Sequence, residues 1–388
     1  MTRTDLPQYA VADLLADYCP GESFFFSSPR SAMLASGEAI LLPDRLADLP
    51  TYVSDLLAAL GGEVPDRVVV GALPFAGLNG ARLVVPVQVR RAGPISAAGL
   101  SRSPGPTTRV SRVLAVPDAQ RYRVAVERAV SMVRAGDLQK VVLARCLQID
   151  LAAPVDVRAV LRSLAWRDPR GYTYAVDLSG GRTLVGASPE LLVSRIGERV
   201  VANPLAGSLP RAADPVEDSR RAAALRTSLK DGREHAFVVE AVVEALRPYL
   251  KRIQVPAEPA AVPTASMWHL STRVTGEVVD PSVTAFHLAT ALHPTPAICG
   301  TPVEAARTVI SQLEPFDRGF YSGMVGWVDA DGDGEWIVGI RCAETDGQSL
   351  RLYAGAGIVA ESSPAAELAE TAAKFQTLLA AMGIPGEM

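Results

Sequence analysis

The sequence predicts an α+β protein in which helices are mixed with antiparallel strands. Two observations favour this class. Strand-like and helix-like segments alternate over residues 118–313, and three strand-like segments then follow one another over residues 321–358 as a meander. Consecutive strands joined by short turns pair antiparallel, because parallel neighbours need long crossover connections. The hydrophobic fraction of 48% is that of a folded globular chain.

The N-terminal part, residues 1–115, is predicted as a mixed α/β region that belongs to the same fold as residues 116–388. Its expected strands are rich in phenylalanine or valine and run from Ser23 to Ser27, Arg67 to Leu73 and Arg82 to Val89. Residues 92–117 are rich in Gly, Pro, Ser and Arg, with Ser103-Pro-Gly-Pro106 at their centre. We therefore expect a loop there.

Clearer periodicity begins at Asp118, which is expected to cap a helix that ends at Gly136. Tyr122, Val126 and Val130 share one face of this helix. The expected elements that follow are a strand at 140–145, a helix at 155–166, strands at 172–178 and 184–185, a helix at 233–246, a strand at 266–278, and helices at 282–292 and 302–313.

The C-terminal region is expected to contain strands at 321–329, 335–345 and 350–358 and then a helix. Ser363 and Pro364 are a favourable N-cap and N1 pair for its start. The acidic segment 329–334 resembles the beginning of an EF-hand loop. Its twelfth position is Ile340 instead of glutamate and strands flank it, so a hairpin turn is expected.

Composition and charge argue against several classes of function. The net charge of −4 leaves no basic excess to neutralise phosphates, so nucleic acid is not expected as a partner. The cysteines Cys19, Cys146, Cys299 and Cys342 form no CxxC pair, which argues against a zinc site. Neither an apolar signal segment nor a run of about 18 apolar residues is visible, so we expect a cytoplasmic protein outside the membrane.

Lysine is rare in this chain. Of 38 basic residues only four are lysines: Lys140, Lys230, Lys251 and Lys374. Arginine can replace lysine on a surface but is not deprotonated near neutral pH, so a retained lysine is a candidate for chemistry that arginine cannot perform. Retention by chance is the alternative, and before context is considered the two have even odds for any one lysine.

Glu367, Glu370 and Lys374 have a spacing that places them on one face of the predicted C-terminal helix. Two carboxylates one turn apart suit a hard cation such as magnesium, and a lysine one turn further on suits an anionic ligand. An exposed, salt-bridged face would have the same spacing. Glu234, at the edge of a mostly buried predicted helix, is a candidate third ligand, although an acid there also suits the helix dipole.

Lys140 and Glu190 are candidates for a base and an acid. Lys140 begins an apolar predicted strand, and Glu190 lies among apolar residues in the segment 186–191. Burial would raise the pKa of the glutamate and make it a general acid, and it would favour the neutral, basic form of the lysine. A lysine leading into a strand commonly extends its ammonium to solvent instead.

Taken together, these segments resemble the chorismate-utilising enzymes, a family that includes anthranilate synthase component I, aminodeoxychorismate synthase, salicylate synthase and isochorismate synthase. The resemblance covers about residues 118–380, with the motifs in family order: Lys140-Val-Val-Leu-Ala-Arg145, Gly186-Ala-Ser-Pro-Glu190, Pro204-Leu-Ala-Gly-Ser208, Arg233-Glu234-His235, His269-Leu-Ser-Thr272, His293-Pro-Thr-Pro296, Tyr321-Ser-Gly-Met-Val-Gly326, Ile340-Arg341, and Gly355-Ala-Gly357 through Glu367-Leu-Ala-Glu370. It implies two stacked antiparallel β-sheets flanked by helices, as in anthranilate synthase component I. It also implies Mg²⁺ and chorismate.

The resemblance also implies roles for individual residues. Magnesium on the ring carboxylate of the substrate would be held by Glu234, Glu367 and Glu370. Lys140 would activate water, Glu190 would protonate the departing C4 hydroxyl, and His269 would lie near the leaving side of the ring unless it is a core histidine. The implied substrate-binding residues are Gly207, Ala297, Ile298, Tyr321, Arg341, Tyr353, Gly355, Gly357 and Lys374. Lys230 and Lys251 match no motif and are expected on the surface.

Two positions distinguish members of the family. The aminodeoxychorismate enzymes carry a lysine nucleophile where this chain has Ala206, and the ring-aminating members and salicylate synthases carry a threonine where it has Ala297. Isochorismate synthases have alanine at the second position, and the segment 24–29, Phe-Phe-Phe-Ser-Ser-Pro, also resembles them. The resemblance therefore implies formation of isochorismate from chorismate, by attack of water at C2 and loss of the C4 hydroxyl.

Two alternatives stay open at this point: a salicylate synthase, which also eliminates pyruvate, and a non-catalytic chorismate-binding paralogue. The intact acid, base and glutamate set argues against the paralogue. We expect a monomer without a glutaminase subunit. The pathway that uses the product, whether for siderophore, salicylate or menaquinone, is not indicated.

Overall fold

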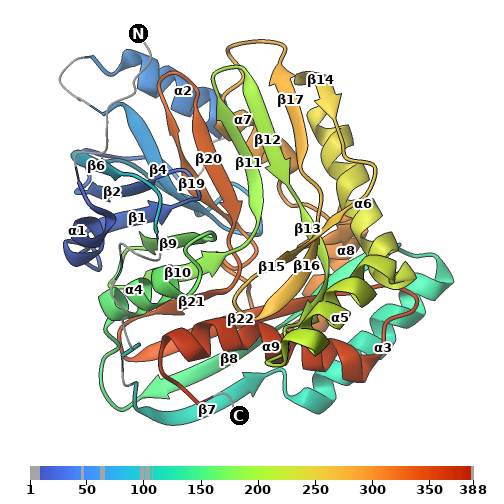
Figure 1. Ribbon diagram of the computed structural model, residues 1–388. Helices are drawn as coiled ribbons and strands as arrows, with labels where there is room; N and C mark the ends of the chain where they lie inside the picture. Colours follow the sequence, from blue (N-terminus) through green and yellow to red (C-terminus); the bar gives the residue numbers. More distant parts are fainter. Residues whose placement is uncertain are drawn as a thin grey trace.

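The computed structural model describes residues 9–44, 48–61, 66–96, 100, 105–106 and 108–385. Two large sheets dominate the molecule, with helices on their outer sides and a small third sheet beside them (Figure 1). The strand pairs within the three sheets are all antiparallel among the described residues. The antiparallel meanders expected from the sequence are thus confirmed.

The first sheet has ten strands and contains both N-terminal and C-terminal segments. Its order is β18 (Gly300–Thr301), β8 (Lys140–Leu151), β22 (Ser349–Ile358), β21 (Cys342–Thr345), β10 (Thr183–Ser188), β9 (Tyr172–Asp177), β1 (Ser23–Ser27), β2 (Ala32–Ser36) and β6 (Gln88–Ala92), with β7 (Val110–Val116) also paired with β8.

The second sheet has nine strands, in the order β14 (Leu250–Gln254), β17 (Val274–Val278), β12 (Arg199–Asn203), β11 (Leu191–Ile196), β20 (Gly334–Val338), β19 (Met324–Asp329), β4 (Val68–Leu73), β5 (Arg82–Val85) and β3 (Ile40–Leu41). The third sheet has the order β13 (Leu205–Pro210), β16 (Met267–Ser271) and β15 (Ala260–Pro263). Strands before residue 93 thus extend both large sheets.

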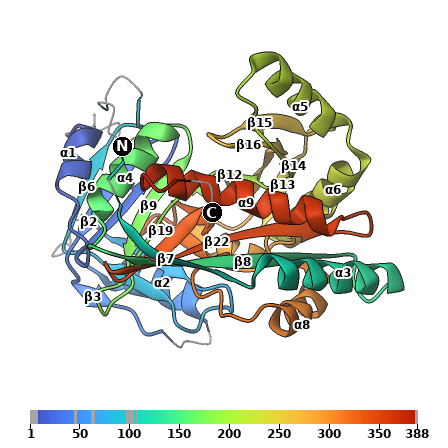
Figure 2. The same ribbon diagram turned by 90° about the horizontal axis from the view of Figure 1, so that it is seen from below.

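Helices cover the sheets from outside. They are α1 (Val11–Ala16), α2 (Leu49–Ala59), α3 (Ala119–Ala135), α4 (Val157–Arg167), α5 (Pro215–Thr227), α6 (Leu229–Leu246), α7 (Ala285–Leu292), α8 (Val303–Leu313) and α9 (Pro364–Ala381). Figure 2 shows α9 lying along β22 and β8. Within the described residues, no helix is long and apolar enough to cross a lipid bilayer.

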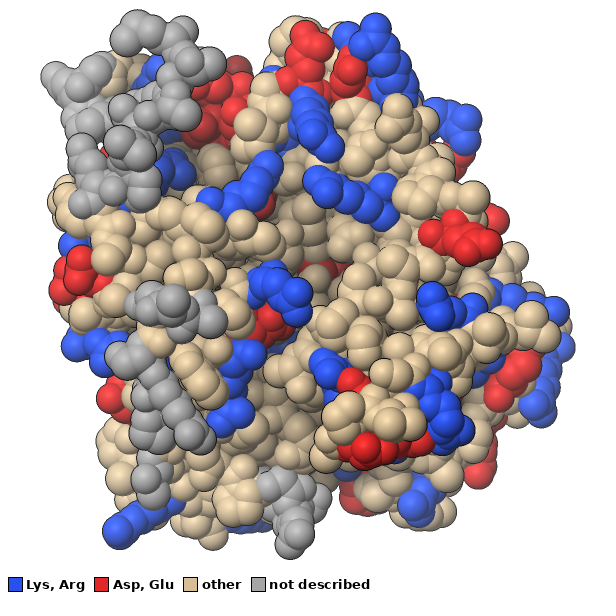
Figure 3. Space-filling view, in the orientation of Figure 1, with Lys and Arg blue, Asp and Glu red and all other residues tan. Residues whose placement is uncertain are grey.

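The core follows the alternation of side chains along the strands. In β1, Phe24 and Phe26 point into the core that the two large sheets share, whereas Phe25 packs with α1, α4 and α9 on the other face of the ten-stranded sheet. This sheet is therefore buried on both faces, which explains its continuous apolar strands. Basic and acidic side chains are interspersed on the face shown in Figure 3.

Several expectations about local structure are confirmed. The Asp118 carboxylate accepts a hydrogen bond from the Arg121 N–H at the start of α3, and Gly136 ends that helix in the left-handed conformation. The acidic segment 329–334 is the turn between β19 and β20. Because Asp329 accepts hydrogen bonds from the backbone of Asp331 and Asp333, this segment closes a hairpin.

Other expectations are wrong. The loop expected over residues 92–117 contains β7, a mostly apolar but incompletely buried strand that pairs with β8. Ser103 and Pro104 lie outside the described residues. The strands expected at 266–278 and 335–345 each divide into two strands that belong to different sheets. Neither α5 nor the three-stranded sheet was predicted. Helix α6 begins at Leu229 instead of Arg233.

Candidate active site

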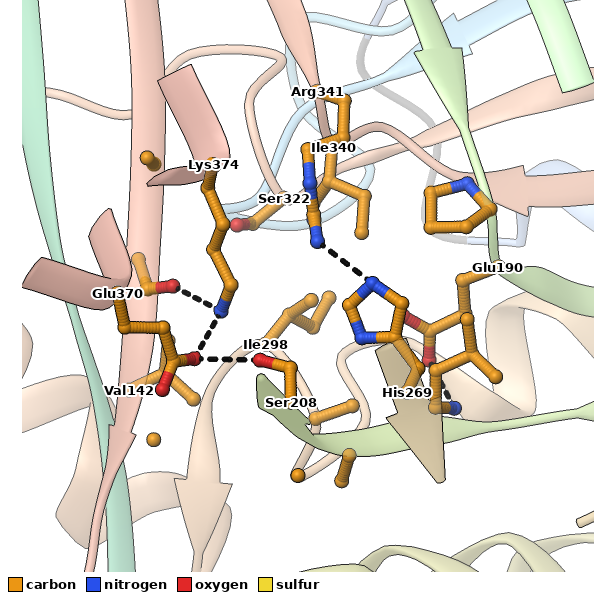
Figure 4. A pocket seen from close by; sticks show the side chains of 18 of the residues that line it. Val142, Glu190, Ser208, His269, Ile298, Ser322, Ile340, Arg341, Glu370 and Lys374 are labelled. Carbon is orange, nitrogen blue, oxygen red and sulfur yellow. Dashed lines mark hydrogen bonds and ion pairs between the residues drawn. The ribbon is translucent and has the colours of Figure 1, made fainter. Parts of the chain in front are cut away.

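A cavity of about 610 Å³, including space open to solvent, lies where the two large sheets, the small sheet and α9 meet. Its lining contains thirteen of the residues singled out from the sequence: Glu190, Gly207, Glu234, His269, Ala297, Ile298, Tyr321, Arg341, Tyr353, Gly355, Gly357, Glu370 and Lys374. In Figure 4, Glu370 and Lys374 lie on one side of this cavity and Glu190 and His269 on the other. Lys140 and Glu367 lie outside the lining. Lys140 forms an ion pair with Glu234, which lines the cavity, whereas the partner of Glu367 is Lys230, which lies outside the lining as well.

Glu190 lies between β10 and β11 and is only 3% exposed. Its carboxylate accepts one hydrogen bond, from the Leu205 N–H at 3.3 Å, and forms no ion pair within the described part of the chain. Burial raises its pKa to about 7, although that hydrogen bond and the more distant Arg341 oppose the shift. The carboxyl can therefore hold a proton near neutral pH, as expected for a general acid.

His269, on β16, lies within hydrogen-bonding distance of Arg341, with 3.2 Å between Nε2 and Nη2. A guanidinium has only donors, so Nε2 must accept and the ring proton lies on Nδ1. Burial and the neighbouring Arg341 hold the pKa of His269 well below its usual value, which keeps the ring neutral. This histidine can donate a hydrogen bond from Nδ1 but is poorly suited to accept a proton. Arg341 itself has a φ of 50°, which turns the chain sharply between β20 and β21.

Helix α9 contributes a paired acid and base to the opposite wall. Lys374 Nζ lies 2.6 Å from Glu370 Oε1 and also donates to the Gly355 carbonyl at 2.7 Å. The Ser208 hydroxyl donates to the same Glu370 oxygen at 2.9 Å. Burial favours the protonated carboxyl, but the Lys374 ammonium outweighs it and holds the pKa of Glu370 below its usual value.

Lys140, the first residue of β8, is fully buried. Its Nζ lies 3.0 Å from Glu234 Oε1, at an angle that makes the contact an ion pair without a hydrogen bond. Gly357 on the adjacent strand β22 makes room for this pair, since a Cβ there would lie 2.1 Å from the same Glu234 oxygen. The extension of lysine to solvent that the sequence left open is therefore not observed.

Lys230 is a site residue that the sequence analysis missed. It was expected on the surface, but its Nζ lies 2.6 Å from Glu367 Oε1 and its side chain is 27% exposed. The expectation was wrong because α6 begins one turn earlier than predicted, which brings Lys230 beside the start of α9. The rarity of lysine was the available signal. Lys251, expected on the surface as well, has a side chain that is 45% exposed.

The three glutamates proposed as magnesium ligands thus each face a lysine: Glu234 with Lys140, Glu367 with Lys230, and Glu370 with Lys374. In this conformation, no three acidic, histidine or cysteine side chains of the described residues form a group that could hold a metal ion. The donor chemistry nevertheless suits magnesium, since carboxylate oxygens are its preferred protein ligands. The buried Glu367 Oε2 also has no hydrogen-bond partner within the described part of the chain.

Aromatic and aliphatic residues complete the cavity. The rings of Tyr321 and Tyr353 are stacked with centroids 5.0 Å apart, and Ile298 lies beside Ala297 in the lining. Behind this wall, the buried Arg318 donates to the carbonyls of Val142 and Ile298 at 2.8 Å each. These two hydrogen bonds fix β8 relative to the segment that carries Ile298, so the wall has a defined shape.

The sequence matches the family of chorismate binding enzymes over residues 95–383. The chain therefore belongs to this family. It is 49% identical over 385 residues to isochorismate synthase DhbC of Bacillus subtilis (strain 168), an alignment that covers 96% of each protein.

Two solved structures agree with this assignment. A Bacillus anthracis protein described as a 2,3-dihydroxybenzoate-specific isochorismate synthase, DhbC, has a TM-score of 0.91 and 47% identity, covering 96% of this chain and 99% of that one. Anthranilate synthase component I of Streptococcus pneumoniae has a TM-score of 0.73 at 21% identity, covering 90% and 92%. The latter shows the fold alone, and it confirms the layered arrangement of antiparallel sheets that the resemblance implied.

Proposed function

We propose that this protein is an isochorismate synthase that converts chorismate to isochorismate with the help of Mg²⁺. Water adds at C2 of the ring and loses a proton, the ring double bonds shift, and the C4 hydroxyl leaves as water after accepting a proton. Atoms balance without an oxidant or a second substrate, because one water enters and one leaves. The chemistry needs one acid, one base and a cationic site for a substrate with two carboxylates.

Glu190 is the acid in this proposal. Its elevated pKa of about 7 keeps a substantial fraction protonated near neutral pH, and it lines the same cavity as the cationic groups that would bind the substrate. His269 donates from Nδ1 and orients the substrate without changing its protonation state. Arg341 positions that imidazole.

Lys140 is the base that takes the proton from water. It is the fully buried member of the three lysine–glutamate pairs, and its ammonium has no hydrogen bond within the described residues. Its partner Glu234 lines the cavity. A change in the charge of Lys140 would therefore act on the substrate site through Glu234.

Magnesium would be held by Glu234, Glu367 and Glu370, and when bound it would neutralise the ring carboxylate and draw electron density from the ring. Lys374, next to Glu370 in the lining, is available for the second carboxylate of the substrate. The backbone at Gly355 and Gly357 allows close approach because these positions carry no side chain.

The observation that carries the proposal is one cavity lined by the unpaired buried acid Glu190, by glutamates of two acid–lysine pairs, and by alanine at positions 206 and 297. Chorismate should be incubated with the enzyme and Mg²⁺ and the products separated by chromatography, with and without ammonium. Isochorismate is the expected product. Salicylate with pyruvate, an aminated product, or unchanged chorismate would each contradict the proposal.

The proposal also covers the use of the product and the location and subunit composition of the enzyme. Since the Bacillus anthracis relative is described as 2,3-dihydroxybenzoate-specific, we propose the same use for the product here. The enzyme would act in the cytoplasm as a single chain, without a glutaminase subunit. A genetic test is growth of a deletion strain on limiting iron with and without 2,3-dihydroxybenzoate, because rescue is expected only if the product has this use.

A further inference from the structure

Lys230 is the most exposed of the three lysines that face the glutamates of the site. The side-chain exposures are 0% for Lys140, 12% for Lys374 and 27% for Lys230. Lys230 is in the first turn of α6, near the surface, so its ammonium can move into solvent when another cation takes its place beside the buried Glu367. Lys140 has no such route.

The ammonium of Lys230 contacts Glu367 and is also under the electrostatic influence of Glu370 and Glu234. Burial lowers the pKa of Lys230, but Glu367, Glu370 and Glu234 together outweigh this effect and raise it above its usual value. The contact of 2.6 Å with Glu367 shows that at least one of these carboxylates binds the ammonium directly. The other carboxylate oxygen of Glu367, Oε2, is buried without a hydrogen-bond partner among the described residues.

We propose that Lys230 is an internal counter-cation of the glutamate cluster, and that a divalent cation takes its place when the cluster is loaded. This inference rests on the proposed magnesium site. An ammonium in contact with Glu367 would repel a divalent cation bound to the same carboxylate, since like charges a few ångströms apart repel strongly in a partly buried site. The two cations therefore exclude each other, so the Lys230 ammonium must leave Glu367 when the metal binds.

This exchange has two measurable consequences. Removing the ammonium should strengthen magnesium binding by about tenfold, because the metal no longer competes with it; a tenfold change corresponds to about 1.4 kcal/mol. Removing it should also lower the melting temperature of the metal-free protein, because the carboxylates then repel each other, and saturating Mg²⁺ should restore that temperature.

The variant is Lys230→Met, which keeps an unbranched side chain and removes the charge. Lys251→Met is a matched control, because Lys251 lies on β14, 45% exposed and 4.0 Å from Glu198, and carries the same charge. Isothermal titration calorimetry of chelator-treated protein with MgCl₂, in the absence of substrate, measures the affinity of each variant and of the wild type.

Tighter binding by Lys230→Met alone is the expected result. Equal affinity in all three proteins would overturn the role of Lys230 while leaving the metal site intact. If none of them binds Mg²⁺, with or without chorismate, the proposed metal site itself is wrong, and the inference fails with it.

A second measurement uses the wild-type protein and so does not depend on the folding of a variant. Reductive methylation with ¹³C-formaldehyde labels exposed lysines and retains their positive charge, and a chain with only four lysines gives a simple NMR spectrum. The Lys230 signal should shift on addition of Mg²⁺, and the Lys251 signal should not. A Lys230 signal that stays unchanged at saturating Mg²⁺ would overturn the exchange.

Discussion

Glu190 and Glu370 are both buried carboxylates in the lining of one cavity, yet their surroundings push them in opposite directions. Glu190 accepts one backbone hydrogen bond and has no cation in contact within the described residues, and its pKa rises to about 7. Glu370 contacts Lys374 and Ser208, and its pKa lies below the usual value. Burial is common to both, so the Lys374 ammonium accounts for the lower pKa of Glu370. A contacting ammonium does not have this effect everywhere, because burial and the neighbouring Glu370 raise the pKa of Glu367 although it contacts Lys230.

This difference separates two tasks within the same site. An unpaired buried acid can hold a proton and give it to a leaving hydroxyl, whereas Glu370, whose pKa is lowered by Lys374, stays ionised and can attract a cation. The wall formed by β10, β11 and β16 thus supplies the acid, and the wall formed by α6 and α9 supplies the glutamates that pair with lysines. The predictions below alter one wall at a time.

The largest effect is expected where the unpaired acid is removed. Glu190→Gln keeps the shape and deletes the transferable proton, so kcat should fall by about 10³-fold. Steady-state assays with chorismate and Mg²⁺ measure this loss, and circular dichroism should show an unchanged fold. In the wild type, activity should decline as pH rises through about 7, because Glu190 loses its proton there. A variant retaining a tenth of the wild-type rate would exclude Glu190 as the acid.

The same substitution should increase stability at high pH. The folded pKa of Glu190, about 7, exceeds its unfolded value of 4.5, so its stabilising contribution is fully present below pH 4.5 and is lost as pH rises through 7. The loss amounts to about 3 kcal/mol. We therefore expect the free energy of unfolding of Glu190→Gln, relative to that of the wild type, to be higher at pH 8.5 than at pH 5. Denaturant titrations at the two pH values measure it. Equal differences at both pH values would contradict the elevated pKa.

On the paired side, Lys140 distinguishes a base from a fixed cation. Lys140→Arg keeps the positive charge beside Glu234 but cannot take a proton, because guanidinium stays protonated. We expect Lys140→Arg and Lys140→Ala both to lose at least about 10²-fold in kcat. Thermal melting checks that each variant folds, since arginine must fit a site with no exposed surface. If folded Lys140→Arg has nearly the wild-type rate, Lys140 is a cation and not the base.

A smaller effect is expected at His269, where geometry rather than proton transfer matters. Asparagine can place an N–H near the position of Nδ1, whereas glutamine reaches the position of Nε2. His269→Asn should therefore retain more activity than His269→Gln or His269→Ala, with a difference of about tenfold. Comparison of kcat with the melting temperature separates a role in the reaction from a purely structural one. Parallel losses in all three variants would indicate a structural histidine.

The smallest effect is expected at Ser208, which supports Glu370 beside Lys374. Ser208→Ala removes one hydrogen bond and leaves the ion pair, so KM should rise by only about two- to fivefold with kcat nearly unchanged. Initial-rate measurements over a range of chorismate and Mg²⁺ concentrations test this. A large loss in kcat would show that Ser208, not the lysine, maintains the charge of Glu370.

Much of the fold followed from the sequence because local signals agreed with the final structure. Asp118 and Gly136 delimit α3 as expected, and the strands in the first sheet are apolar enough to identify. The failures have a common cause. The segment at 266–278 passes from one sheet to another at Thr272 and Arg273, where no glycine or proline marks a break. Pairing with distant strands, which local sequence does not encode, decides such boundaries.

The candidate site, like the fold, was predicted only in part. Motifs placed Glu190, His269, Arg341 and Lys374 in one lining correctly, since each lies in a segment with a strong pattern. Lys230 was missed because its role depends on where α6 starts and on how α6 and α9 meet. Tertiary contact, not the residue's own surroundings in sequence, makes it part of the site.

The central claim is that Glu190 stays protonated near neutral pH because no cation contacts it, while Glu370 stays charged because one does. The most direct test is a pH titration of protein carrying ¹³C-labelled glutamate carboxyls, followed by NMR, with the Glu190 signal assigned from its absence in Glu190→Gln. The account predicts that this signal titrates near pH 7. A Glu190 carboxyl that titrates near pH 4.5, like an ordinary glutamate, would contradict it.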